Sequence, residues 1–81
     1  MYNVLIKVEF MNKDNYIETK NLYYESLDDK DKAIKTVDGY FDNKETLKNI
    51  VKVFGSDYIE GIVTECDYNK EEVILDTIVF L

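Results

Sequence analysis

The chain has 81 residues, of which 46% are hydrophobic and 33% are charged, and its formal net charge is −7. This balance is typical of a folded globular protein, and the length predicts a single domain over residues 1–81. All ten cationic residues are lysines, so the chain lacks the basic, arginine-rich patch of a direct nucleic-acid binder, and its charge argues against an anionic membrane surface.

Missing residue types narrow the chemistry further. There is no histidine and a single cysteine, Cys66, which excludes Ser–His and Cys–His pairs and a structural zinc site. We therefore expect a protein that is not an enzyme, with no catalytic residues, metal or cofactor. The unpaired cysteine, together with the lack of a leader or an apolar run of about 20 residues, predicts a cytoplasmic location.

The N-terminal third is predicted to form two strands. Residues 2–10 alternate between apolar and polar side chains, which indicates a strand with one buried face. Residues 16–24 are rich in Tyr, Thr and Ile, which are favoured in strands. The polar segment 11–15 between them suggests the turn of a hairpin, whose register the pattern leaves open.

A first helix is predicted over residues 27–38. Ser26 is a typical N-cap, and Asp28 and Asp29 would lie in the first turn, where the helix dipole favours anions. The narrow apolar stripe indicates a surface helix, which we expect to end at Gly39.

A second helix is predicted from an Asp42 or Asn43 cap to Phe54, with Gly55 as its stop. It has the clearest periodicity in the chain, because its apolar residues recur at the spacing of one helical face. Those residues, which we expect to pack into the core, are Leu47, Ile50, Val51 and Phe54.

Residues 57–68 and 72–81 are predicted to form a second hairpin. A turn around residues 68–71 gives a register in which Cys66 opposes Val73 in the core, and it places large apolar residues on both faces. The face turned away from the helices would carry Ile59, Ile78 and Phe80. The resulting ββααββ order predicts an α+β fold, with two helices packed on one face of a largely antiparallel sheet.

Six of the seven excess negative charges fall on residues 56–81. In the predicted register four of these acids share one face, and Asp67 lies opposite Glu72, which costs folding energy unless a cation offsets it. Three interpretations are open: a solvated acidic face, a docking surface whose carboxylates stand in for phosphates, or a divalent-cation site. The four acids of the shared face are Glu65, Asp67, Glu72 and Asp76.

We expect an inhibitor that docks this acidic hairpin on a basic partner protein, for instance a nucleic-acid-binding protein. The small, acidic, Tyr-rich composition resembles that of many phage-encoded inhibitors of host defence, including anti-restriction and anti-CRISPR proteins, although no residue carries over. The alternative is a homo-oligomeric module, for instance a homodimer joined through the second apolar sheet face, that sequesters a small ligand or has a structural role. Tyr23 and Tyr24 are further contact candidates beside the predicted partner-binding residues Glu65, Asp67, Tyr68, Glu71, Glu72 and Asp76.

Overall fold

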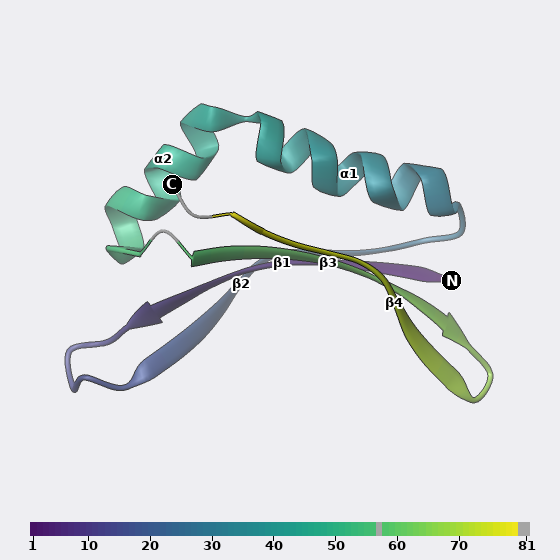
Figure 1. Ribbon diagram of the computed structural model, residues 1–81, viewed down its shortest axis with the longest axis horizontal. Coiled ribbons are helices and arrows are strands. Elements are labelled where there is room, and N and C mark those ends of the chain that lie inside the picture. Colours follow the sequence, from purple (N-terminus) through teal and green to yellow (C-terminus); the bar gives the residue numbers. More distant parts are fainter. Residues whose placement is uncertain (57, 80–81) are drawn as a thin grey trace.

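Four antiparallel strands form one sheet, and two helices cover one of its faces (Figure 1). The computed structural model describes residues 1–56 and 58–79, so the predictions for Asp57, Phe80 and Leu81 lie outside the described residues. The ββααββ order and the α+β architecture confirm the predicted fold class. The elements are β1 (Tyr2–Met11), β2 (Ile17–Leu27), α1 (Lys30–Asp42), α2 (Lys44–Phe54), β3 (Tyr58–Asp67) and β4 (Lys70–Val79).

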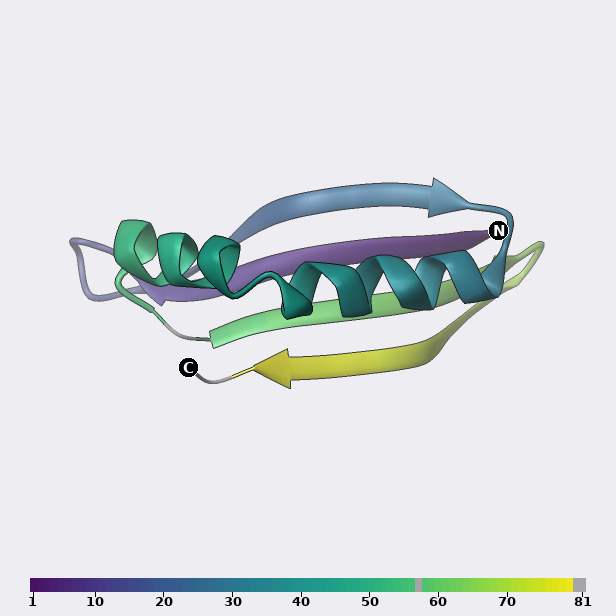
Figure 2. The same cartoon turned by 90° about the horizontal axis from the view of Figure 1, so that it is seen from above.

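The sheet order is β2-β1-β3-β4, so the two hairpins join through β1 and β3 (Figure 2). Val4, Ile6 and Val8 alternate along β1 and are fully buried toward the helices, as the period-two pattern predicts. The central strands therefore supply the floor of the core, and β2 and β4 form the edges. Neither described helix is long and apolar enough to cross a membrane.

The core lies between the helices and the two central strands. Helix α1 comes especially close to β3 at Gly61, where an added Cβ would lie 2.6 Å from Phe41 Cε2 and 2.8 Å from Val37 Cγ1. The missing side chain allows this close approach. The buried apolar residues are Val4, Ile6, Val8, Ala33, Val37, Leu47, Ile50, Ile59 and Val63.

The start of α1 differs from the prediction. Its N-cap is Asp29, whose side chain accepts hydrogen bonds from the backbone N–H groups of Asp31 (2.8 Å) and Lys32 (3.2 Å). Ser26 still belongs to β2, and its hydroxyl donates to Asn3 Oδ1 on β1 at 2.7 Å. Strand pairing thus extends three residues further than the sequence pattern indicates, and the helix begins later.

The end of α1 also differs, because the helix passes through Gly39 and continues to Asp42. The next residues, Tyr40 and Phe41, pack against the core, which favours the extra turn over an exit at glycine. Asn43 then separates the helices: its N–H donates to Tyr40 O, and its side chain accepts from Thr46 N at 3.1 Å. Asn43 as the cap of α2 confirms one of the two predicted alternatives.

The stop of α2 is the one predicted. Gly55 has φ 66° and ψ 23°, a left-handed conformation that glycine adopts without strain, and its N–H donates to Val51 O at 2.8 Å. Toward their turns, both hairpins bend away from the helices (Figure 1). The sheet face without helices, called the open face below, is therefore concave along the long axis of the molecule.

Candidate functional site: the acidic end

The register of the β3–β4 hairpin is not the predicted one. Asp67 pairs with Lys70 across Tyr68 and Asn69, and Glu65 pairs with Glu72. The turn thus comes one residue earlier than expected. A bulge follows, because β4 passes from the Thr64–Val73 pair to the Val63–Leu75 pair and leaves Ile74 as the extra residue.

This register separates the predicted acidic array. Glu65 lies on the same side of β3 as the buried Val63, toward the helices, and its partner Glu72 shares that side. Asp76 instead pairs with Ile62, and Glu71 with Cys66, so both belong to the open face. The prediction that Asp76 shares a face with the other three acids is therefore wrong, because the extra residue Ile74 reverses the face on which the following residues of β4 lie.

The three acids on the helix side still form a cluster. Glu65, Asp67 and Glu72 line a hollow of about 200 Å³ together with Lys70. Lys70 and Asp67 are cross-strand neighbours of opposite charge next to the turn, whereas Glu65 and Glu72 are directly opposed like charges. Such a pair is destabilising by a fraction of a kcal/mol up to about 1 kcal/mol unless a cation approaches. The like-charge conflict that the sequence predicts is present, but between different residues.

Tertiary structure adds acids from elsewhere in the chain. The Tyr2 hydroxyl lies 3.5 Å from Glu65 Oε1. Partial burial raises the pKa of Tyr2, and the negative charges of Glu65 and Asp29 raise this pKa further. The start of α1 and the β3–β4 turn thus lie at the same end of the molecule (Figure 1). We call the acidic end the set of Asp28, Asp29, Asp31, Glu65, Asp67 and Glu72.

Sequence reasoning missed the α1 part of this site. The sequence pattern places Asp28 and Asp29 only in the first turn of a surface helix, with no link to the hairpin. Their closeness to the hairpin depends on the strand order, in which β1 lies between β2 and β3 and carries Tyr2 next to Glu65. The sequence does show acids before α1 and acids on both sides of the β3–β4 turn. The pattern alone does not place these two groups at the same end of the molecule.

The predicted tyrosine contacts differ in accessibility. Tyr68 is fully exposed at the hairpin tip, and Tyr24 is 62% exposed on the open face. Tyr23 lies on the helix side, where its ring centroid is 6.3 Å from that of Tyr40 and its hydroxyl donates to Glu25. That hydrogen bond raises the pKa of Tyr23. Tyr68 and Tyr24 are thus available for contacts, and Tyr23 is half-buried.

Cys66 is not the core residue that the predicted register suggests. It lies opposite Glu71 rather than Val73, on the open face, and is half-buried. Its sulfur accepts a hydrogen bond from Asn3 Nδ2 at 3.1 Å. In the described part of the chain, no three acidic or thiol side chains come together in a way that could hold a metal ion, so the geometry gives the cation interpretation no support.

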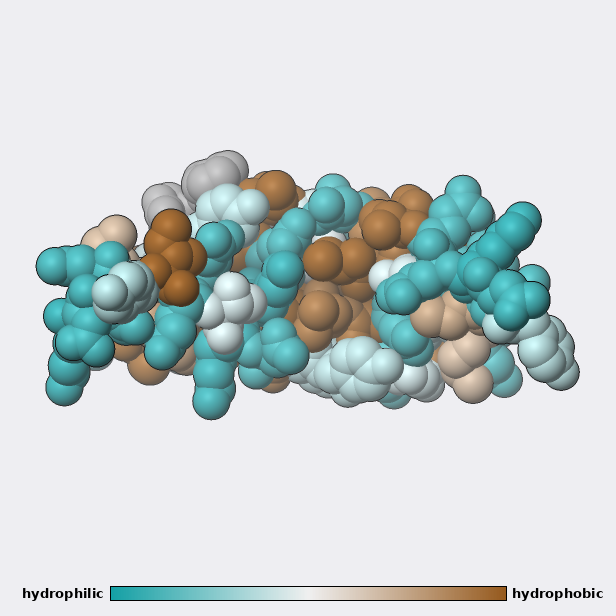
Figure 3. All heavy atoms as spheres, turned by 90° about the horizontal axis from the view of Figure 1, so that it is seen from below, coloured by the Kyte–Doolittle hydropathy of each residue, from teal (hydrophilic) through white to brown (hydrophobic). Residues whose placement is uncertain are grey.

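The open face carries much of the exposed apolar surface. Five of the nine large hydrophobic residues that are exposed among the described residues belong to it: Met11, Ile17, Tyr24, Val73 and Ile78. Hydrophobic side chains gather over its middle (Figure 3). Ile78 is here as predicted, whereas Ile59 is fully buried on the helix side and that part of the prediction is wrong.

A charged group lies in the middle of the open face. Glu60 is 9% exposed, and its carboxylate oxygen is 3.2 Å from Lys7 Nζ. Burial raises the pKa of Glu60, and a hydrogen bond with Asp76 raises it further, while Lys7 acts in the opposite direction. The group therefore holds two carboxyls against one ammonium.

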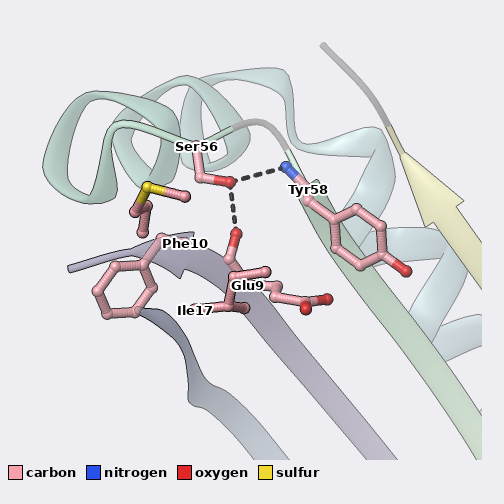
Figure 4. A pocket seen from close by; sticks show the side chains of 6 residues that line it. Glu9, Phe10, Ile17, Ser56 and Tyr58 are labelled. Atoms are coloured by element: carbon pink, nitrogen blue, oxygen red, sulfur yellow. Dashed lines mark hydrogen bonds between the residues drawn. The ribbon is translucent and has the colours of Figure 1, made fainter. Parts of the chain in front are cut away.

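A second hollow of about 270 Å³ lies where β1 and β2 meet the segment before β3 (Figure 4). The Ser56 hydroxyl donates to Glu9 O and accepts from Tyr58 N at 3.2 Å, which joins this segment to β1. Phe10 packs against Phe54 with ring centroids 5.1 Å apart. The remaining residues that line the hollow are Met11 and Ile17. The hollow therefore suits an apolar side chain better than a reactive group.

Comparison of the chain with protein-family models, with curated proteins and with solved structures gives no match. The acidic end and the open face are therefore the features of this chain that bear on its function.

Proposed function

We propose that this protein is a non-enzymatic protein-binding module that docks its acidic end on a basic surface of a partner protein. The observation that supports this function best is that two acidic segments, the start of α1 and the β3–β4 hairpin, lie at the same end of the molecule (Figure 1), with Asp29 and Glu65 both near Tyr2. Concentrated charge of one sign speeds association with an oppositely charged surface. A basic surface that normally binds nucleic acid would accept these carboxylates in place of phosphates, so the module would act as an inhibitor.

The opposed Glu65 and Glu72 support the same proposal. A folded protein that keeps a like-charge pair across two strands loses stability, and a cationic partner that approaches both carboxylates recovers it. The fully exposed Tyr68 beside them and the exposed Glu71 on the other face of the hairpin extend the contact surface. Tyrosine is enriched in protein interfaces, and small acidic inhibitors of host defence, whose composition this chain resembles, are the class the proposal points to.

The test is a pull-down from a lysate of the source cells with three forms of the protein. The acidic-end variant is Glu65→Gln/Asp67→Asn/Glu72→Gln, and the matched control is Glu18→Gln/Asp38→Asn/Glu45→Gln, which removes the same number of exposed charges elsewhere. We expect wild type and control to retain the same partner at about 0.05 M salt and to lose it at about 0.5 M. The acidic-end variant should retain little at either salt concentration, and equal capture by all three forms would rule the proposal out.

A second candidate is a homo-oligomeric module, favoured by the exposed apolar residues of the open face. It requires two copies to bring like-charged faces together, because among the described residues the strand side chains of the open face include four acids, Glu9, Glu60, Glu71 and Asp76, and one lysine, Lys7. Sedimentation equilibrium separates the candidates, since a concentration-independent monomer mass removes the second one.

A further inference from the structure

We infer that the open face binds a basic amphipathic helix of a partner protein, laid across the strands. The inference deepens the proposed function, because it assumes the same kind of basic partner and names the segment and the face. Side chains alone must hold this ligand, since the backbone groups of the central strands are already paired within the sheet. An extended peptide would bind at a sheet edge instead.

The shape of the face suits a rod that crosses the strands. Both hairpins bend away from the helix layer, so the open face is concave along the strands and its valley runs perpendicular to them (Figure 1). The molecule measures 40 × 26 × 16 Å, with the strands along the long axis. Crossing four strands takes roughly 15 Å at ~4.8 Å between neighbours, a length that about ten residues of α-helix cover.

An apolar row lies along that valley. The strand pairing places Tyr24 of β2, Leu5 of β1 and Ile62 of β3 side by side, and Asp76 of β4 completes the row. Tyr24 is 62% exposed, and Leu5 and Ile62 are half-buried. Figure 3 shows a group of hydrophobic side chains over the middle of this face, and mostly hydrophilic ones toward both ends. An apolar stripe on a helix would pack along the row.

The charges of the open face determine which charge the partner segment must carry. Lys7 is already paired with Glu60 at 3.2 Å, so it offers no free cation to an incoming acid. Asp76 and Glu71 are exposed, Glu9 is half-buried, and all three belong to the open face. Lysines or arginines beside the apolar stripe of a helix would meet these carboxylates, whereas a second copy would oppose acids to acids.

The experiment uses isothermal titration with three synthetic peptides. One is a leucine–lysine helix of about four turns with a single apolar stripe, the second has the same composition in scrambled order, and the third is nona-lysine. The face variant is Tyr24→Ser/Ile62→Thr. Its matched control is Tyr16→Ser/Val53→Thr, which makes the same type of change at residues 71% and 74% exposed in the β1–β2 connection and on α2, outside the apolar row.

We expect the striped peptide to bind wild type and control equally, at least tenfold more tightly than the scrambled peptide, and to bind the face variant at least tenfold more weakly. Equal binding of striped and scrambled peptides would overturn the inference. Should the face variant fail to fold by circular dichroism, amide shifts of the wild type with the striped peptide decide instead. Changes centred on Leu5, Tyr24 and Ile62 support the inference, and changes confined to residues 65–72 refute it.

Nona-lysine separates this inference from the proposed function, because it has charge and no apolar stripe. In one outcome, nona-lysine binds wild type but not the acidic-end variant, and wild type shows no preference for the striped peptide. This outcome refutes the helix site and leaves the proposed function of the acidic end intact. A preference for the striped peptide that survives in the acidic-end variant supports the helix site independently of the acidic end. A wild-type dimer that the face variant converts to monomer assigns the face to a second copy and overturns the inference.

Discussion

Glu60 and Lys7 form an ion pair of 3.2 Å on adjacent central strands, in the middle of a sheet face that no helix covers. The Glu60 side chain is nearly buried by its neighbours on that face, and it shares a hydrogen bond with Asp76. A buried carboxyl with another carboxyl beside it resists ionisation. The pair therefore connects the stability of the fold to pH at the place where we infer that a partner binds.

Burial and Asp76 raise the pKa of Glu60 above its usual value of 4.5, so the folded state holds this proton more tightly than the unfolded chain. The contribution of Glu60 to stability is thus most favourable below the unfolded pKa and is lost as pH rises through the folded pKa. For the Glu60→Gln variant, we expect the free energy of unfolding to fall less than that of wild type as pH rises from about 4.5 toward neutrality. Urea denaturation at a series of pH values measures this.

Asp76→Asn serves as the companion variant, because it removes the second carboxyl of the group. The pH dependence attributed to Glu60 should become weaker in this variant, since Lys7 then acts without opposition from Asp76. Parallel pH curves for wild type and Glu60→Gln would contradict the assignment.

Glu72→Lys is expected to stabilise the fold. It turns the like-charge pair with Glu65 into an opposite-charge pair, a change worth about 0.5–1 kcal/mol at low salt. The gain in the free energy of unfolding should shrink as salt screens the charges. The control is Glu71→Lys, whose cross-strand neighbour is the uncharged Cys66, and a gain at Glu71 equal to that at Glu72 would argue against a pairwise cause.

Gly61→Ala is expected to destabilise the fold by about 1–3 kcal/mol, because the new methyl group would overlap Phe41 and Val37 of α1 and force the helix away from the sheet. Thermal or urea unfolding measures the loss. Gly39→Ala is the matched control: Gly39 lies within α1, and an added Cβ meets nothing within 4 Å. Alanine there should stabilise the helix by roughly 0.5–1 kcal/mol, so opposite signs at the two glycines are the expected result.

Asp29→Ala is expected to cost about 0.5–2 kcal/mol of stability, because two backbone N–H groups at the start of α1 lose their acceptor. Ser26→Ala provides the comparison, since its hydroxyl makes only exposed hydrogen bonds, to Asn3 and Tyr24, and caps no helix. The free energies of unfolding of the two variants decide which residue begins the helix. A larger loss at Ser26 would restore the cap that the sequence pattern indicates.

Much of the fold could be predicted because it depends on local patterns. Alternation marks β1, the i, i+3, i+4, i+7 spacing marks α2, and Gly55 marks its end, each through backbone geometry that a few neighbouring residues impose. The limits of α1 were harder, because both depend on distant contacts. Ser26 pairs with Asn3 on another strand, and Tyr40 and Phe41 pack on the core.

The candidate site was predicted only in part. Glu65, Asp67 and Glu72 do come together, but Asp76 does not join them, because the extra residue Ile74 bulges and moves the residues after it to the opposite face. A shift of one residue moves a strand side chain to the opposite face, and the register set by the turn and the bulge was not evident in the composition of the hairpin.

The amino-acid sequence by itself determined the net charge, the absence of imidazole chemistry, the α+β order and the concentration of acids in the last hairpin, since these follow from residue types and short-range periodicity. Tertiary structure alone decided that Asp29 and Glu65 both lie near Tyr2, that Glu60 is buried beside Lys7, and that Tyr24, Leu5 and Ile62 form one row. Strand order and register bring together residues that are distant in the chain, and in this molecule they separate an anionic end from an apolar valley.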